Sequence, residues 1–170
     1  MLWNEVGDSV SIFGPCGGKV NAATFSPDNQ YLLTGTTDSL ATLWELTGER
    51  VRDYRGHNGQ ILEAQFSTDG SIVLTRSGDA TVRVWEREGQ PLAEEIQHQA
   101  WIYHAAFIPN QSVVLTRGAD DEVGLWSEKR DKTQTLKTEQ KITKAATASN
   151  SGGQLAYSFS NETTFLLDLE

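Results

Sequence analysis

The stretch SIVLTRSGDATVRVWE, residues 71–86, predicts two β-strands joined by a tight turn. β-Branched and aromatic residues fill both halves, which favours strands over helices. Between them stand Ser77, Gly78 and Asp79, residue types that are typical of turns. No helical periodicity appears here or elsewhere in the chain. The class predicted from this stretch is therefore all-β.

The segment just before it, ILEAQF at residues 61–66, is a further strand with an irregular pattern. Its apolar residues Ile61, Ala64 and Phe66 are separated by steps of three and then two. Strict alternation interrupted by one extra residue is the pattern of a β-bulge. We expect this strand, a fourth outer strand and the two strands of residues 71–86 to form one small antiparallel sheet.

The same pattern returns every 41 residues, with no insertion between copies. The recurring positions are Trp3, Trp44, Trp85 and Trp126; Phe25, Phe66 and Phe107; Asp38, Asp79 and Asp120; and Gly7, Gly48 and Gly89. In the fourth copy Leu167, Ala148 and Asn161 replace the tryptophan, phenylalanine and aspartate. Four independent positions with one period indicate a repeat architecture.

Composition excludes several function classes. The 170 residues carry a net charge of −9, which argues against a nucleic-acid surface. One basic stretch, residues 129–144, is interrupted by acidic residues and is expected to be a solvated hairpin. No apolar run is long enough to span a bilayer, and the N-terminus lacks the features of a signal peptide. The single cysteine, Cys16, fits a reducing compartment, so we expect a cytoplasmic protein without membrane contact.

The repeats resemble the WD-repeat β-propeller family over essentially the whole chain. The resemblance rests on VNAATFSPDN (20–29) followed by LLTGTTDSLATLWE (32–45), and on IYHAAFIPNQ (102–111) followed by VLTRGADDEVGLWS (114–127). It implies four-stranded antiparallel blades, four in this chain, at about 16–56, 57–97, 98–138 and 139–170. An N-terminal strand at residues 9–14 would complete the last blade.

The number of blades leads to an expectation about assembly. Blades of this type usually need seven or eight copies to complete a circle, so four of them are expected to form a half-ring. Two chains would then form an eight-bladed homodimer, in which each N-terminal strand completes the partner's final blade. A strained four-bladed ring and a fragment of a longer propeller are the alternatives.

The resemblance also implies two hydrogen-bonded groups of four residues: His57, Thr75, Asp79 and Trp85, and then His98, Thr116, Asp120 and Trp126. A histidine with an aspartate and a hydroxyl also suggests a nucleophilic triad. A group that recurs in successive repeats is better explained as a network that satisfies buried polar groups. GPCGGKV at 14–20 lacks the first glycine and final Ser/Thr of a phosphate loop, and the histidines and Cys16 lack metal-ligand spacing. We therefore expect no enzyme activity, cofactor or metal.

Trp101 and Tyr103 flank Ile102, which matches the inward positions Ile61 and Val20 of the earlier copies. The two aromatic residues therefore point away from the shared core. The positions that match them are Lys19 and Asn21, Gln60 and Leu62, and Ile142 and Lys144.

In the resembled family these positions lie on the rim of the top face, where partners dock. Trp and Tyr are frequent interface anchors, although local packing of Trp101 is the alternative. We expect a non-enzymatic scaffold that binds a protein or peptide through Trp101, Tyr103 and Leu62, with Gln60, Lys19, Asn21 and Lys144 as polar contacts. A purely structural, oligomerising segment of a larger protein is the alternative function.

Overall fold

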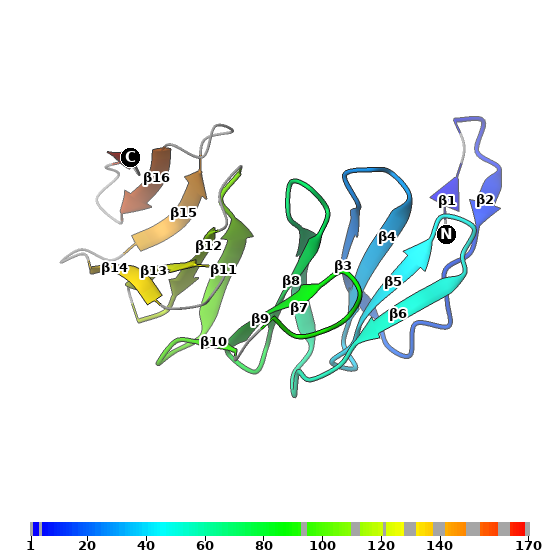
Figure 1. Ribbon diagram of the computed structural model, residues 1–170, viewed down its shortest axis with the longest axis horizontal. Helices are drawn as coiled ribbons and strands as arrows, with labels where there is room; N and C mark the ends of the chain where they lie inside the picture. Colours follow the sequence, from blue (N-terminus) through cyan, green and yellow to red (C-terminus); the bar gives the residue numbers. More distant parts are fainter. Residues whose placement is uncertain are drawn as a thin grey trace. The chain divides into compact units, whose positions relative to one another are not determined.

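The computed structural model describes residues 2–3, 5–92, 95–109, 113–120, 122–127, 132–137, 142–148, 154–159 and 164–168. These residues form strands, turns and loops with no helix among them, which confirms the all-β class. Within the described residues, therefore, no helix is long and apolar enough to cross a membrane. The chain divides into two compact units, Met1–Pro91 and Leu92–Glu170, each of which is described by itself (Figure 1).

The first unit contains a four-stranded antiparallel sheet, called sheet 1. Its strands are β3 (Val20–Phe25), β4 (Tyr31–Thr36), β5 (Ala41–Glu45) and β6 (Arg50–Tyr54), and they pair in sequence order. The β5–β6 turn contains Gly48, whose φ of +94° lies in the left-handed region that favours glycine. The chain therefore turns at one of the glycines that recur with the repeat period.

Sheet 2 of the same unit contains β7 (Ile61–Phe66), β8 (Ile72–Ser77) and β9 (Thr81–Glu86), also antiparallel. The pairing of β7 with β8 shifts by one residue between Ile61 and Glu63. The same shift occurs in β3 of sheet 1 and in β11 (Ile102–Phe107), the corresponding strand of the second unit. The predicted bulge is confirmed, and it returns with the repeat.

The core of the first unit lies between sheets 1 and 2, where β3 and β7, the first strands of the two sheets, lie side by side (Figure 1). Sheet 1 contributes Leu33, Ala41, Leu43 and Tyr54, and sheet 2 contributes Ile61, Ala64, Val73 and Trp85. Gly35 marks the closest approach, because a Cβ at this position would lie 2.4 Å from Ile61 Cγ2. Sheet 1 therefore packs through its face with Leu33 and Leu43. Sheet 2 packs through the opposite face of its repeat, which carries Ile61 and Ala64.

One prediction about this core is wrong. Val20, Ala23 and Phe25 were expected to point inward like Ile61 and Ala64, but all three are exposed, Val20 by 42% and Phe25 by 49%. Ile61 and Ala64 are buried because sheet 1 covers them. In the described part of the first unit, no further sheet covers the corresponding part of sheet 1.

The N-terminal strands form a small pair next to sheet 1. β1 (Leu2–Trp3) pairs antiparallel with β2 (Ser9–Ser11). The strand predicted over residues 9–14 is therefore shorter, because β1 offers only two residues for pairing. After β2, the ring of Phe13 packs edge-on against Trp44, with centroids 6.3 Å apart.

The second unit begins with the short strand β10 (Ile96–Gln97). Sheet 3 follows, with β11 (Ile102–Phe107), β12 (Val113–Gly118), β13 (Glu122–Ser127) and β14 (Lys132–Lys137) in sequence order. Sheet 3 is a four-stranded antiparallel sheet with the topology of sheet 1.

The C-terminal sheet contains β15 (Ile142–Ala148), β16 (Gln154–Phe159) and β17 (Thr164–Asp168). Its antiparallel register places Ala156 opposite Leu166. The expectation of three strands in the fourth repeat is met within the described residues.

Candidate interaction surface and internal hydrogen-bond networks

A chain of hydrogen bonds runs through sheet 2 and brings together His57, Thr75, Asp79 and Trp85. The His57 side chain is fully buried; its Nδ1 lies 2.9 Å from Asp79 Oδ2 and its Nε2 lies 2.8 Å from Thr75 Oγ1. Trp85 Nε1 donates to the same hydroxyl at 3.0 Å. Because the carboxylate can only accept, His57 carries its proton on Nδ1 and accepts the Thr75 hydroxyl at Nε2.

The electrostatics of sheet 2 favour a neutral histidine beside a charged aspartate. Burial lowers the pKa of His57, although its hydrogen bond to Asp79 opposes this effect. Burial raises the pKa of Asp79, but hydrogen bonds from the Thr81 hydroxyl, the Asn58 N–H and His57 outweigh it. The pKa of Asp79 is therefore lowered to about 2.

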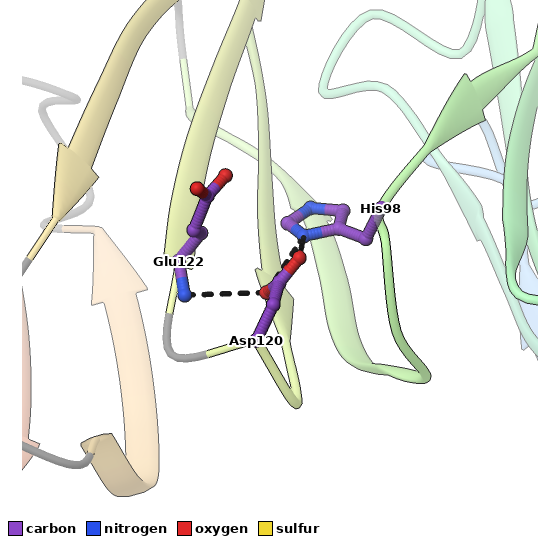
Figure 2. A group of neighbouring side chains, drawn as sticks. All are labelled: His98, Asp120 and Glu122. Atoms are coloured by element: carbon purple, nitrogen blue, oxygen red, sulfur yellow. Dashed lines mark hydrogen bonds and ion pairs between the residues drawn. The ribbon is translucent and has the colours of Figure 1, made fainter.

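Sheet 3 repeats this network with His98, Thr116, Asp120 and Trp126. Figure 2 shows His98 turned toward Asp120, and the distance from Nδ1 to Asp120 Oδ2 is 3.1 Å. His98 Nε2 lies 2.7 Å from Thr116 Oγ1, which also accepts from Trp126 Nε1 at 2.8 Å. The His98 side chain is 1% exposed, so this ring is as enclosed as that of His57.

Glu122 distinguishes sheet 3, because it occupies the position of Thr81 one period later. His98, Asp120 and Glu122 each bring a potential metal-ligating atom within 4.8 Å of the others, a grouping that the histidine spacing alone did not indicate. Both ring nitrogens of His98 already have protein partners, and Asp120 also accepts the Glu122 N–H at 3.2 Å (Figure 2). The group as arranged is therefore a hydrogen-bond network and does not present a free imidazole nitrogen to an ion.

Sheet 1 keeps half of the network. Trp44 Nε1 donates to Thr34 Oγ1 at 2.8 Å, as in the other sheets. Cys16 replaces the histidine, and its thiol contacts the Phe13 carbonyl at 3.6 Å. Asp38 instead accepts the Thr36 hydroxyl. Sheet 1 therefore lacks the ring that connects the threonine to the aspartate in sheets 2 and 3.

These networks have the geometry of structural groups. A general base must reach a substrate with a free lone pair. The side chains of His57 and His98 are 0% and 1% exposed, and both nitrogens of each ring have partners within the sheet. The arrangement satisfies buried polar atoms and connects two strands, the turn between them and the loop before the first strand of each sheet.

The exposed aromatic pair, Trp101 and Tyr103, lies at the start of sheet 3. The side chains are 42% and 51% exposed, whereas Ile102 between them is fully buried. The Ala119 N–H donates to the Trp101 carbonyl at 2.7 Å, which fixes the backbone against the β12–β13 turn. The Arg117 guanidinium lies 5.0 Å from the centroid of the Tyr103 ring, within cation–π range. The pair is therefore both accessible and held in place.

Lys19 and Gln60 occupy the positions in the first unit that match Trp101. The Thr37 N–H donates to the Lys19 carbonyl and the Gly78 N–H donates to the Gln60 carbonyl, each at 2.9 Å. This is the same bond as that between Ala119 and Trp101, so the three positions are structurally equivalent. Lys19 and Gln60 are exposed.

The remaining predicted contacts differ from one another. Asn21 Nδ2 donates to the Ile61 carbonyl at 3.0 Å and contacts Gln60 Oε1 at 3.3 Å, so this side chain connects sheets 1 and 2. Leu62 is only half-buried. Lys144 falls on β15, and its side chain lies outside the described residues.

Sequence reasoning missed the contact between Arg117 and Tyr103. Arg76 and Arg117 recur one period apart, which predicts a salt bridge to a neighbouring carboxylate for each, and Arg76 pairs with Glu63 at 2.9 Å. One period later His104 replaces Glu63 opposite the arginine. That replacement was the available signal that Arg117 has a different environment.

The comparisons with known proteins agree with this architecture. The family model WD40, described as "WD domain, G-beta repeat", matches residues 7–45 and 48–86. The crystal structure of the computationally designed Ika4 protein is similar, with a TM-score of 0.77 and 24% identity over 96% of this chain and 99% of that chain. At this identity the likeness supports a propeller-like all-β fold, and no curated protein sequence matches the chain. Residues 7–45 and 48–86 of this chain therefore form two repeats that match the WD40 family model.

Proposed function

We propose that this chain is a non-enzymatic scaffold that binds a protein or peptide through the aromatic pair Trp101 and Tyr103. WD40 repeats generally mediate protein–protein interaction, which supports the class of function. The observation that carries the proposal is the exposure of two large aromatic side chains on a strand whose intervening residue is buried. Aromatic residues on a fixed backbone lose little conformational entropy on binding, which makes them effective anchors.

The surroundings of the pair favour a partner with an apolar segment. Arg117 is mostly buried and lies against the Tyr103 ring, so its guanidinium supports the aromatic surface from beneath. In the first unit, Lys19 and Gln60 are exposed at the equivalent position of their repeats and are proposed as polar contacts. Leu62, Asn21 and Lys144 complete the proposed set, although the amide of Asn21 is already engaged in holding sheets 1 and 2 together.

Peptide display tests this proposal, because a selected peptide can take the place of the natural partner. Ligands selected on the wild-type chain are measured against the double variant Trp101→Ala/Tyr103→Ala and against Val51→Ala, a control at a 40% exposed apolar residue in the first unit. The double variant should weaken binding by roughly 10-fold or more, with an unchanged melting temperature. Equal binding to all three chains contradicts the proposal. A large drop in melting temperature assigns the pair to packing instead.

Self-association is the second candidate, and the unequal N-terminal and C-terminal sheets favour it. β1 and β2 form a two-stranded pair, while β15, β16 and β17 form a three-stranded sheet. β2 and the three C-terminal strands would together supply a complete four-stranded blade, as in the proposed eight-bladed homodimer of two half-rings. Light scattering across a dilution series tests this candidate: a mass of twice 18.7 kDa supports it, and a mass of 18.7 kDa at all concentrations contradicts it.

A further inference from the structure

Sheet 3 differs from sheet 2 at one position beside its buried network. In sheet 2 the Thr81 hydroxyl donates to Asp79 Oδ1 at 2.7 Å and lies 3.1 Å from His57 Nδ1. In sheet 3 Glu122 stands at this position. A hydroxyl can donate to the carboxylate beside it, whereas an ionised carboxylate can only accept. The replacement therefore places a second acceptor where sheet 2 has a donor.

The replacement also brings two carboxyl groups close to one imidazole. His98, Asp120 and Glu122 each have one potential ligand atom within 4.8 Å of the others. All three residues are partly buried, and the His98 side chain is only 1% exposed. Two negative charges at this separation repel each other, and the repulsion grows as water is excluded. A cation between them removes the repulsion, and a divalent ion balances both charges.

The spacing of His98 and Asp120 is close to that of two zinc ligands. Histidine nitrogen and carboxylate oxygen bind Zn²⁺ at about 2.0–2.2 Å in a tetrahedral site, which holds neighbouring ligand atoms about 3.3–3.6 Å apart. His98 Nδ1 lies 3.2 and 3.1 Å from the two Asp120 oxygens (Figure 2). A small opening of this contact and a turn of the Glu122 side chain therefore bring three ligand atoms to one point.

The proton of the imidazole must be displaced before an ion can bind. His98 Nδ1 faces a carboxylate, so it carries the proton of the neutral ring, and Nε2 accepts the Thr116 hydroxyl. An ion at Nδ1 takes the place of that proton. Nε2 then takes up a proton and donates it to Thr116 Oγ1, so the ring stays neutral. The bond to Thr116 is kept and orients the ring, as outer hydrogen bonds of metal-binding histidines do.

We propose that His98, Asp120 and Glu122 form a Zn²⁺ site in sheet 3. A ligand set of imidazole and carboxylate suits Zn²⁺, whereas Mg²⁺ and Ca²⁺ prefer oxygen ligands alone. Three protein ligands leave the fourth position to water. The ion connects the segment before β11, the β12–β13 turn and the first residue of β13, which carry the three ligands. This inference does not depend on partner binding at the aromatic pair.

Glu122→Thr is the central test variant, because it gives sheet 3 the residue that sheet 2 carries at the same position. Calorimetric titration of the full chain with ZnCl₂ should show one ion per wild-type chain. Loss of a hydrogen-bond partner of a ligand costs about 10–100-fold in metal affinity, so loss of Glu122 itself should raise the dissociation constant at least about 10-fold. Thr81→Ser, at the matching position of sheet 2, is the control and should bind zinc like the wild type. Glu122→Gln keeps the size of the side chain without its charge, and it replaces Glu122→Thr if that variant does not fold.

Two further readouts place the ion. Zinc should raise the melting temperature of the wild type and of Thr81→Ser more than that of Glu122→Thr. In ¹⁵N spectra of the histidine rings, zinc should shift Nδ1 of His98 and leave His57 unchanged. Binding to Cys16 or to other surface groups would survive Glu122→Thr.

Three results would overturn the site. These are a wild type that binds no zinc, equal zinc affinity in the wild type and the Glu122 variants, and binding that leaves the His98 ring signals unchanged. In each case the two carboxylates of sheet 3 are held apart or share a proton. None of these results affects binding at Trp101 and Tyr103, which the peptide assay measures independently.

Discussion

The replacement Thr75→Val tests whether the buried network of sheet 2 stabilises the fold. Thr75 is fully buried, and its hydroxyl is shared by Trp85 Nε1 and His57 Nε2 at 3.0 and 2.8 Å. Valine has nearly the shape of threonine, so packing changes little while the hydroxyl is lost. The variant leaves one buried donor and one buried acceptor without their partner.

The magnitude follows from these two groups. An unsatisfied buried polar group costs about 1–3 kcal/mol, so the two groups together should lower the free energy of unfolding of Thr75→Val by about 2–6 kcal/mol. Thr34→Val is the matched control. Thr34 accepts a hydrogen bond from Trp44, but Cys16 stands at the histidine position, so Thr34 makes no hydrogen bond to a histidine. Thr34→Val should cost about half as much. Thr24→Val, on the surface of sheet 1, should change stability by less than about 0.5 kcal/mol.

Urea unfolding, followed by tryptophan fluorescence and far-UV circular dichroism, measures these differences. With a slope of about 2 kcal/mol per molar urea, the Thr75→Val midpoint should fall by about 1–3 M. The slope itself should stay constant across the three variants. If Thr75→Val shifts the midpoint no more than Thr34→Val does, the histidine link contributes no stability and the reasoning is refuted.

Three further predictions address other parts of the molecule. Stability should fall as the pH drops below about 6.5, because the lowered pKa of His57 makes its protonation favour the unfolded chain. Asp79 should contribute a further loss of about 2 kcal/mol between about pH 4 and pH 2, because its pKa is about 2 in the folded state; Asp79→Asn should make the loss in this range smaller in urea titrations at each pH. Gly35→Val should lower the melting temperature and cost about 1–3 kcal/mol, because its Cβ would lie 2.4 Å from Ile61 Cγ2; an unchanged melting curve would contradict the close packing of sheets 1 and 2. Tyr103→Ala should change the free energy of unfolding by less than about 1 kcal/mol, because the ring is 51% exposed; a larger loss in urea unfolding would show that the Arg117 contact holds sheet 3 together.

Sequence periodicity predicted the local structure of each repeat well, because alternation and turn chemistry act over a few residues. The strands at 61–66, 72–77 and 81–86 and the bulge after Ile61 all follow from such local patterns. The outward direction of Trp101 and Tyr103 followed from the same register, since Ile102 is fixed in the core.

Contacts between repeats were harder to predict. A repeat pattern states which face of a sheet is apolar, but it does not state whether a neighbouring sheet covers that face. Val20 and Phe25 fit the pattern of Ile61 and Phe66 and are nevertheless exposed. The contact between Arg117 and Tyr103 was missed for a related reason, since it depends on which side chain lies opposite the arginine rather than on the period.

The hydrogen-bond networks stabilise individual sheets, whereas the apolar faces hold neighbouring sheets together. The network residues of sheet 2 are all contributed by the loop before β7, by β8, by its following turn and by β9, so they hold one sheet together without help from a neighbour. Sheet 1 keeps its fold with Cys16 in place of the histidine, because the Trp44–Thr34 bond remains and Phe13 packs on Trp44. The apolar faces have no such internal compensation and depend on an adjacent sheet. Substitutions in the network should therefore lower the unfolding free energy, whereas substitutions at the exposed residues of the sheet 1 face should leave it nearly unchanged.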